Sequence, residues 1–136
     1  MKLDTYLFFD GNCEQAIKFY ERCLGGRIEA IMRYEGSPAE QEVPAEWRNR
    51  VMHACLMVGD RMLMASDCPP GRFDRPQGFS VSLAVAEPAE AERAFNALAD
   101  GGKITMPMGT TFWSARFGML VDKFGIPWMV NCQQAA

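Results

Sequence analysis

Four side chains in this sequence, His53, Cys55, Asp67 and Cys132, are candidates for acid–base or metal chemistry. His53 is its single histidine and a candidate for ligand binding or proton transfer, beside the more ordinary role of a hydrogen-bonded structural residue. Asp67 precedes a cysteine and two prolines, so it is either a turn residue at the end of a strand or a catalytic carboxylate. His53, Asp67, Cys55 and Cys132 are also the side chains that could bind a metal ion.

A second group of residues is suited to binding a flat organic molecule. Phe112 and Trp113 offer apolar faces near Arg116, a combination that can sandwich a ring and pair with an anionic group. In the alternative interpretation, the two aromatic residues cover the open end of a barrel or pack in a dimer interface, while Arg116 caps a carboxylate. Arg116 is therefore a candidate for catalysis or binding, and Trp113 for binding.

The composition limits the class of protein to which these residues belong. The chain has 136 residues, 49% of them hydrophobic, which suffices for one domain. The net charge of −3 argues against a nucleic-acid partner, since phosphate binding needs a basic face. Five cysteines without a C-x-x-C pair favour reduced thiols over disulfides or a zinc site. The apolar run 6–9 is too short for a signal peptide or membrane span, so we expect a soluble cytoplasmic protein whose mature chain begins near Met1.

The first half of the chain predicts a strand, a helix and three further strands. Asn12 and Gln15 form a capping-box pattern, and apolar residues follow at spacings of three and four until Gly25-Gly26. Gly59-Asp60 indicates a hairpin between the last two strands. The predicted elements are a strand over 3–9, a helix over 13–24, a strand over 27–34, a polar loop over 35–49, and strands over 50–58 and 61–66.

The second half repeats this order. A shift of 75 residues pairs Ala16 with Ala91 and Tyr20 with Phe95, which indicates an internal duplication. We therefore expect a single domain over 1–136, built of module 1 at about 1–70 and module 2 at about 76–136. The predicted elements of module 2 are a strand over 79–85, a helix from Pro88 to the Gly101-Gly102 pair, and strands over 103–106, 116–121 and 127–132.

The duplicated βαβββ order resembles that of the vicinal-oxygen-chelate superfamily, which includes glyoxalase I, bleomycin-resistance proteins and dioxygenases. Six stretches are similar to its bacterial PhnB-like group: 9–16, 19–20, 24–26, 51–54, 111–118 and 124–131. The resemblance covers the whole chain and implies an α+β fold in which two βαβββ modules form a cupped mixed β-sheet. Such proteins often carry the domain name of a 3-demethylubiquinone-9 3-methyltransferase. The Gly-rich strand-to-helix loop expected for S-adenosylmethionine is missing from this sequence.

The resemblance also implies where relatives bind a divalent metal ion. Each half supplies one ligand from its first strand and one from its last, and the aligned positions here are Thr5, Met64, Ser80 and Met129. Hydroxyls and thioethers bind hard or borderline divalent ions weakly. We therefore expect no metal at these positions and no cofactor, but a cup that binds an organic ligand through the same four residues. Asn131 shares the face of Met129 and would supply an orienting amide.

Three functions remain open at this point. The first is a PhnB-like small-molecule-binding protein that captures an aromatic or hydrophobic ligand in a methionine-lined cup. The alternative is an enzyme of the superfamily that acts on a small carbonyl or ring substrate, with His53, Asp67 or Arg116 as catalytic residues. It would be a lyase, a dioxygenase-like enzyme or the methyltransferase of the domain name. The third is a structural or partner-binding protein. We expect a homodimer, because each half leaves apolar sheet edges to be covered, with halves paired within one chain or by domain swapping. Whether the loop 35–49 closes over the cup as a lid is left open.

Overall fold

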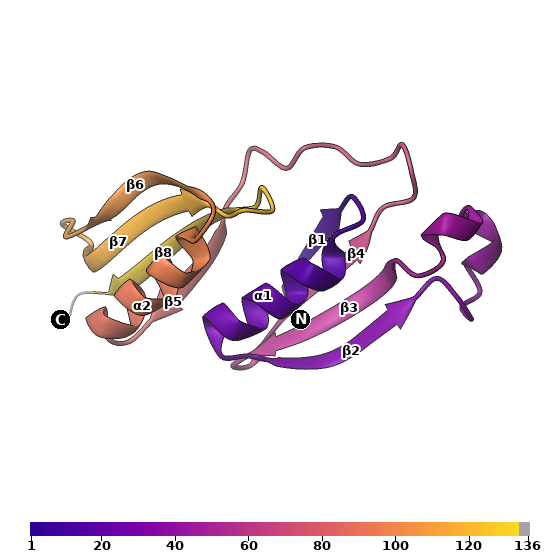
Figure 1. Cartoon of the computed structure of the whole chain (residues 1–136). Coiled ribbons are helices and arrows are strands. Elements are labelled where there is room, and N and C mark those ends of the chain that lie inside the picture. Colours follow the sequence, from indigo (N-terminus) through magenta and orange to yellow (C-terminus); the bar gives the residue numbers. More distant parts are fainter. Residues whose placement is uncertain (134–136) are drawn as a thin grey trace. The chain divides into compact units, whose positions relative to one another are not determined.

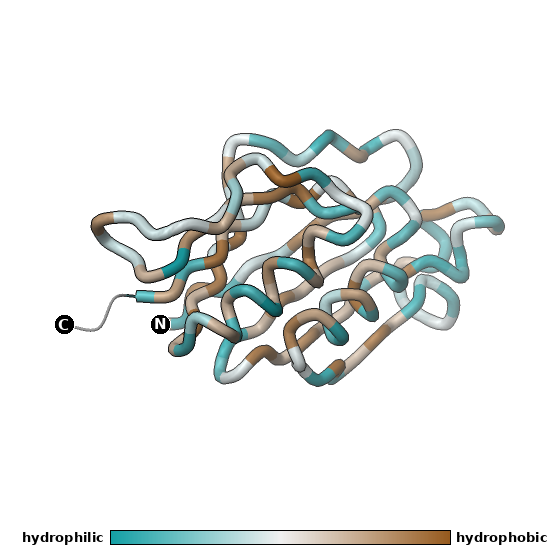
Figure 2. The backbone as a smooth tube through the Cα atoms, turned by 60° about the vertical axis from the view of Figure 1, so that its left-hand side comes forward, coloured by the Kyte–Doolittle hydropathy of each residue, from teal (hydrophilic) through white to brown (hydrophobic). Residues whose placement is uncertain are grey.

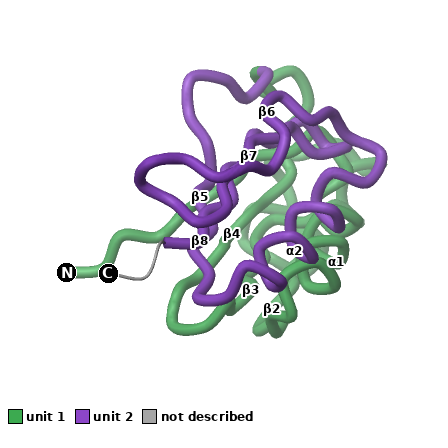
Figure 3. The backbone as a smooth tube through the Cα atoms, turned by 90° about the vertical axis from the view of Figure 1, so that its left-hand side faces the viewer, with its two compact units in different colours: residues 1–74 green, residues 75–136 purple. Residues whose placement is uncertain are grey.

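The computed structural model describes residues 1–133 and divides the chain into two compact units (Figure 3). The N-terminal unit is Met1–Asp74, and the C-terminal unit begins at Arg75.

Both units have the predicted order βαβββ (Figure 1). The N-terminal unit contains β1 (Thr5–Phe9), α1 (Cys13–Leu24), β2 (Arg27–Arg33), β3 (Val51–Val58) and β4 (Arg61–Asp67). The C-terminal unit contains β5 (Val81–Val85), α2 (Pro88–Ala99), β6 (Lys103–Gly109), β7 (Ser114–Val121) and β8 (Pro127–Gln133). The polar loop predicted between β2 and β3 includes two single-turn 3₁₀ helices, Glu40–Glu42 and Ala45–Trp47.

The two sheets have the same topology. The strand orders are β1-β4-β3-β2 and β5-β8-β7-β6. β1 pairs with β4 and β5 pairs with β8 in parallel, while the remaining pairs within residues 1–133 are antiparallel. The helix carries the chain from the first strand to the opposite edge of the sheet, and the last three strands then return by antiparallel pairing. The internal duplication that the sequence predicts is therefore present in the fold.

Each sheet has one face covered by the helix of its own unit, which we call the helix face, and an opposite face, which we call the far face. In the C-terminal unit, a Cβ added to Gly118 would lie 2.7 Å from the Phe95 ring of α2, so α2 packs directly on β7. Gly118 pairs with the buried Val130, which assigns Val130 to the helix face. The same alternation buries Leu7, Phe9 and Ala65 against α1 in the N-terminal unit.

The helices are amphipathic and have 12 residues each. Hydrophilic and hydrophobic residues alternate along both of them in Figure 2. Gly25 adopts the predicted left-handed cap of α1, with φ 70°. The capping-box prediction is wrong, because the Asn12 side chain makes no capping hydrogen bond. The carboxylate of Asp67 instead accepts a hydrogen bond from the N–H of Cys13, the first residue of α1. No helix among the described residues has the length and apolar content that a membrane span requires.

The strands differ from the prediction mainly at their ends. β6 runs to Gly109, beyond the predicted end at residue 106, although it contains Pro107. It is the edge strand of its sheet and has two register shifts against β7, and both features allow a proline that donates no hydrogen bond. β7 begins at Ser114 rather than at Arg116.

Candidate functional site

The strand register locates the residues of the expected cup. On the far face of the N-terminal unit, Met64 pairs with Tyr6. On the far face of the C-terminal unit, Met129 pairs with Ser82. Met64 and Met129 thus occupy equivalent positions, each on the last strand of its unit and beside a hydroxyl-bearing residue of the first strand.

The two first-strand residues expected from the sequence lie elsewhere. Thr5 pairs with the buried Leu63, so it lies on the helix face of the sheet, opposite to Met64. Val81, which pairs with the buried Trp128, holds the same position in the C-terminal unit. Ser80 precedes β5 and is not part of its pairing with β8. The structure therefore does not bring Thr5 and Met64 together.

The donor atoms at these positions do not fit the divalent metal of the superfamily. Tyr6 and Ser82 carry hydroxyls, and Met64 and Met129 carry thioethers, which are weak ligands for hard or borderline divalent ions. Within residues 1–133, no three His, Cys, Asp or Glu side chains are grouped so that they could share a metal ion.

An aromatic cluster with a polar pair lies on the far face of the N-terminal unit. The Tyr6 hydroxyl and His53 Nδ1 are 3.1 Å apart and share a hydrogen bond. The Tyr6 ring centroid lies 5.1 Å from that of Phe8 and 5.7 Å from that of His53. The exposed fractions of Tyr6 and Phe8 are 38% and 54%. The cluster, Tyr6, Phe8 and His53, thus presents flat apolar surface and hydrogen-bonding atoms together.

The Tyr6–His53 pair can act as donor or acceptor toward a bound molecule. When the phenol donates to Nδ1, the imidazole carries its hydrogen on Nε2 and offers a donor. When Nδ1 donates to the phenol oxygen, Nε2 becomes an acceptor and the phenol hydrogen turns outward. The sequence analysis missed Tyr6, although the alternation of Tyr6 and Phe8 with Leu7 and Phe9 indicates an aromatic face on either side of β1.

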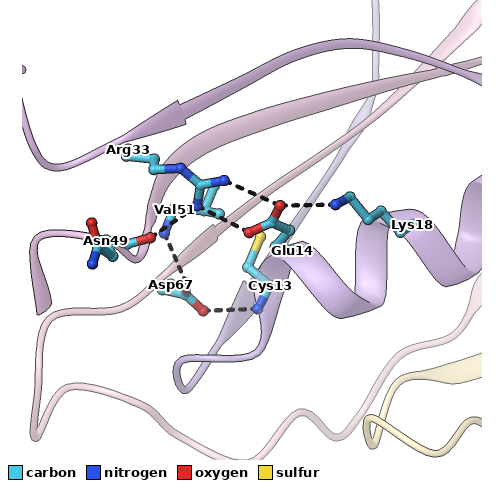
Figure 4. Close-up of polar contacts among 7 residues, drawn as sticks. All are labelled: Cys13, Glu14, Lys18, Arg33, Asn49, Val51 and Asp67. Carbon is cyan, nitrogen blue, oxygen red and sulfur yellow. Dashed lines mark hydrogen bonds and ion pairs between the residues drawn. The ribbon is translucent and has the colours of Figure 1, made fainter.

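Asp67 has a structural environment (Figure 4). Its buried Oδ1 accepts hydrogen bonds from the backbone N–H groups of Gly11 and Cys13, and Oδ2 accepts one from Val51, all at 2.9 Å. Asp67 pairs with Phe9 on the helix face, so the sheet separates it from His53 on the far face. Burial, together with the Asp67 charge, raises the pKa of the Cys13 thiol well above its usual range, which removes Cys13 as a nucleophile.

A network of ion pairs lies on the surface near the N-terminus of α1, and Figure 4 shows its members. Arg33 donates to both carboxylate oxygens of Glu14, at 3.0 and 3.1 Å, and Lys18 lies 3.0 Å from Glu14. The hydrogen bonds from Arg33 and Lys18 lower the pKa of Glu14 to about 2. Arg33 also donates to the Asn49 carbonyl, so the network connects α1, β2 and the loop before β3.

Arg116 and the aromatic residues before it do not form a common binding site. Arg116 pairs in register with the buried Cys132 on the helix face, and its guanidinium contacts the Glu92 carboxylate of α2. Trp113 instead packs its edge against Phe117, with ring centroids 5.5 Å apart, and Phe112 is 91% exposed. The interpretation that Arg116 caps a carboxylate is the one that the geometry supports.

Asn131 lies on the far face of the C-terminal unit, on the same side of β8 as Met129. Its neighbours across the sheet are Phe117 on β7 and Ala84 on β5. Asn131 Oδ1 is buried and has no hydrogen-bond partner among the described residues. A buried acceptor without a partner is uncommon in proteins and indicates strain, an ordered water or a ligand.

Comparison with known proteins agrees with the fold. The family model described as glyoxalase/bleomycin resistance protein/dioxygenase superfamily matches residues 2–130. Protein YjdN of Escherichia coli (strain K12) is 34% identical over 139 residues, covering 96% of this chain and 95% of that protein. The crystal structure of protein PA1353 from Pseudomonas aeruginosa has a TM-score of 0.90 and 48% identity, with 99% of each chain covered.

A third relative connects the chain to the PhnB group. The structure of a PhnB protein from Bacillus cereus, also named as a 3-demethylubiquinone-9 3-methyltransferase, has a TM-score of 0.79 and 28% identity. The alignment covers 97% of this chain and 99% of that one. The duplicated βαβββ units, the match of the family model and these relatives together show that the chain belongs to the glyoxalase/bleomycin resistance protein/dioxygenase superfamily.

Proposed function

We propose that this protein is a PhnB-like small-molecule-binding protein, which captures an organic ligand on the far face of its N-terminal unit without a metal at the usual positions. The observation that carries the proposal is the hydrogen-bonded Tyr6–His53 pair beside the exposed ring of Phe8. The pair would hold a polar group of the ligand while the rings cover its apolar part. The ligand class is therefore an aromatic or conjugated molecule with a carbonyl, hydroxyl or similar hydrogen-bonding group.

Exposed apolar surface on this face supports the proposal. Phe8, Tyr6 and Met32 are all exposed, and Met32 pairs in register with His53. Large apolar side chains that gather on one exposed face often mark a binding site. Covering the exposed half of the Phe8 ring, ~100 Å² at ~25 cal/mol per Å², would contribute about 2.5 kcal/mol before the costs of association.

Native mass spectrometry of freshly purified protein tests this function directly. We expect an organic molecule to remain bound without a stoichiometric divalent metal ion, and aromatic phenols or carbonyl compounds to raise the melting temperature in a thermal-shift panel. Phe8→Ala should weaken binding of a stabilising compound by up to about 70-fold, since it removes the apolar contribution of about 2.5 kcal/mol estimated above. Tyr6→Phe should weaken it by about 2- to 10-fold, which corresponds to one neutral hydrogen bond.

Phe112→Ala is the matched control, because it removes an exposed aromatic ring from the C-terminal unit. If Phe8→Ala and Phe112→Ala have the same effect on binding, the aromatic cluster is not the site. Near-stoichiometric nickel, zinc, iron or manganese in protein purified without chelator would contradict the metal-free part of the proposal.

A second candidate function is proton transfer on a small carbonyl or ring substrate, and the same pair favours it. A phenol hydrogen-bonded to an imidazole can pass a proton between Nδ1 and the hydroxyl oxygen while Nε2 faces the substrate. Turnover that His53→Gln abolishes while the protein stays folded would favour the enzyme. The methyltransferase name of the Bacillus cereus relative has no counterpart in this sequence, which lacks the strand-to-helix Gly-rich loop.

We also propose a cytoplasmic homodimer. All five cysteines are buried thiols, which suits a reducing compartment. β2 and β6 are edge strands, and Ile104 and Met106 on β6 are exposed apolar residues that a second chain would cover. Light scattering coupled to size exclusion should give a mass near 30 kDa, twice the 15.2 kDa of one chain, and a mass of one chain would contradict the dimer.

A further inference from the structure

Sulfur-bearing side chains gather on the far face of the N-terminal unit, next to the Tyr6–His53 pair. In the pairing of β3 with β4, Cys55 lies opposite Met64 and Met57 lies opposite Met62. Because residues two apart on a strand share a face, all four side chains lie on the far face with Tyr6. This face therefore carries one thiol and three thioethers on two adjacent strands.

One thioether contacts the thiol, and a second belongs to the residue opposite it on the neighbouring strand. The Cys55 Sγ donates a hydrogen bond to the Met62 Sδ at 3.5 Å. Met64 is the direct cross-strand neighbour of Cys55, a relation in which Cβ atoms lie about 5 Å apart. Cys55 is buried, while Met62 and Met64 are half-buried. A thiol that contacts one thioether and pairs across the strands with a second methionine, shielded from most of the solvent, has the composition of a soft-metal site.

The geometry and the donor type select the kind of ion. Two sulfur atoms that bind one metal at ~2.3 Å in a tetrahedral site are ~3.8 Å apart. The Cys55 Sγ and the Met62 Sδ are 3.5 Å apart, which is close to this separation. Thiolate and thioether ligands favour Cu(I), whereas carboxylate and water suit magnesium, calcium and manganese. We propose that Cys55, Met62 and Met64 bind one soft monovalent cation of the Cu(I) class.

Binding requires no change of oxidation state. Cu(I) replaces the hydrogen of the Cys55 thiol, a sulfur–metal bond forms as the S–H bond breaks, and the proton leaves to the solvent. The thioethers of Met62 and Met64 donate lone pairs without losing a group. This site goes beyond the proposed organic ligand and does not rest on it, since none of its three ligands belongs to the aromatic cluster. Met64 is at a position where relatives bind a divalent ion, but Cys55 and Met62 are not, and thioethers that bind divalent ions weakly are good ligands for Cu(I).

The C-terminal unit supplies an internal control. Its residue equivalent to Cys55 is Met119, which lies opposite Met129 on the far face. Two thioethers face one another there without the thiol. Met129→Leu therefore changes a methionine at the position equivalent to Met64 and leaves the proposed site intact.

Anaerobic competition between the full, reduced chain and the Cu(I) chelator bathocuproine disulfonate tests the site. We expect the protein to take one Cu(I) per chain. Met62→Leu and Met64→Leu should each lower the Cu(I) affinity by about tenfold or more, although both variants keep all five thiols. Leucine conserves the volume of methionine, so these variants should stay folded, as circular dichroism would verify.

Three results of this competition decide whether Cu(I) binds where we propose. Cu(I) affinity that is unchanged in Met129→Leu and in Tyr6→Phe supports the site and shows that it is independent of the aromatic cluster. No uptake of Cu(I) by the wild-type chain would overturn the proposal. Uptake that Met62→Leu and Met64→Leu leave unchanged would also overturn it, because the metal would then be held by thiols alone.

Discussion

The buried carboxylate of Asp67 is the anchor of the N-terminal unit, and its replacement by asparagine tests that role with almost no change of shape. In the wild type, Oδ1 accepts from Gly11 and Cys13, and Oδ2 accepts from Val51. In Asp67→Asn, the amide oxygen can keep the first two bonds, but the amide nitrogen meets the Val51 N–H. Two donors then face one another in a buried place.

The expected cost follows from these three bonds. The Val51 N–H and one amide hydrogen lose their partners, at about 1–3 kcal/mol each. The two remaining bonds lose the negative charge that roughly doubles their strength. We therefore expect Asp67→Asn to lower the free energy of unfolding by about 3–5 kcal/mol, a large fraction of the stability of a domain this size.

Urea unfolding followed by far-UV circular dichroism measures this cost. Asp60→Asn is the matched control, since the Asp60 side chain is 96% exposed and its change should stay within about 0.5 kcal/mol. A change below about 1 kcal/mol for Asp67→Asn would refute the reasoning. It would mean that the three backbone donors find other partners once the carboxylate is gone.

Three further predictions concern a surface charge, a packing contact and a buried amide. Glu14→Gln should cost at most about 1 kcal/mol, because the carboxylate is partly exposed. The lowered pKa of Glu14 means that this stabilisation is present above the ordinary pKa of 4.5 and is lost as the pH falls toward about 2, which acid titration of both proteins would show. Gly118→Ala should destabilise by about 1–3 kcal/mol in urea because its Cβ would overlap Phe95, whereas Gly109→Ala, with its nearest atom at 4.0 Å, should change little. Asn131→Leu should raise the melting temperature of the ligand-free protein, since it removes a buried acceptor without a partner; a clear decrease would show that an ordered water satisfies Oδ1.

The fold was accessible from the sequence because its signals are local. Strand alternation, glycine caps and the hairpin at Gly59 all act within a few residues, and the duplication doubles each signal. The capping box predicted at Asn12 is absent, and the carboxylate that does bond the first turn of α1, Asp67, lies 54 residues away in sequence from Cys13. No local pattern can show that a strand-end carboxylate reaches a helix terminus.

The candidate site was less accessible, and the error in β1 shows why. A shift of one residue along a strand moves a side chain to the other face of the sheet. The alignment placed Thr5 beside Met64, but Tyr6 is the residue that pairs with Met64, and Thr5 lies on the opposite face. Met64, Met129 and Asn131 lie on far faces, as the strand spacing indicates. The partners of His53 and Arg116 come from other elements and could be found only in three dimensions.

The repeated topology also has an evolutionary consequence. Two copies of one unit in a single chain must both keep the apolar packing under their helices. Residues on the far face do not take part in this packing, so they can change without disrupting it. The two surfaces have accordingly diverged: tyrosine and cysteine adjoin the methionine of one copy, whereas serine and a second methionine adjoin that of the other. Duplication thus allows one half to acquire a chemistry that the other half never needs to share.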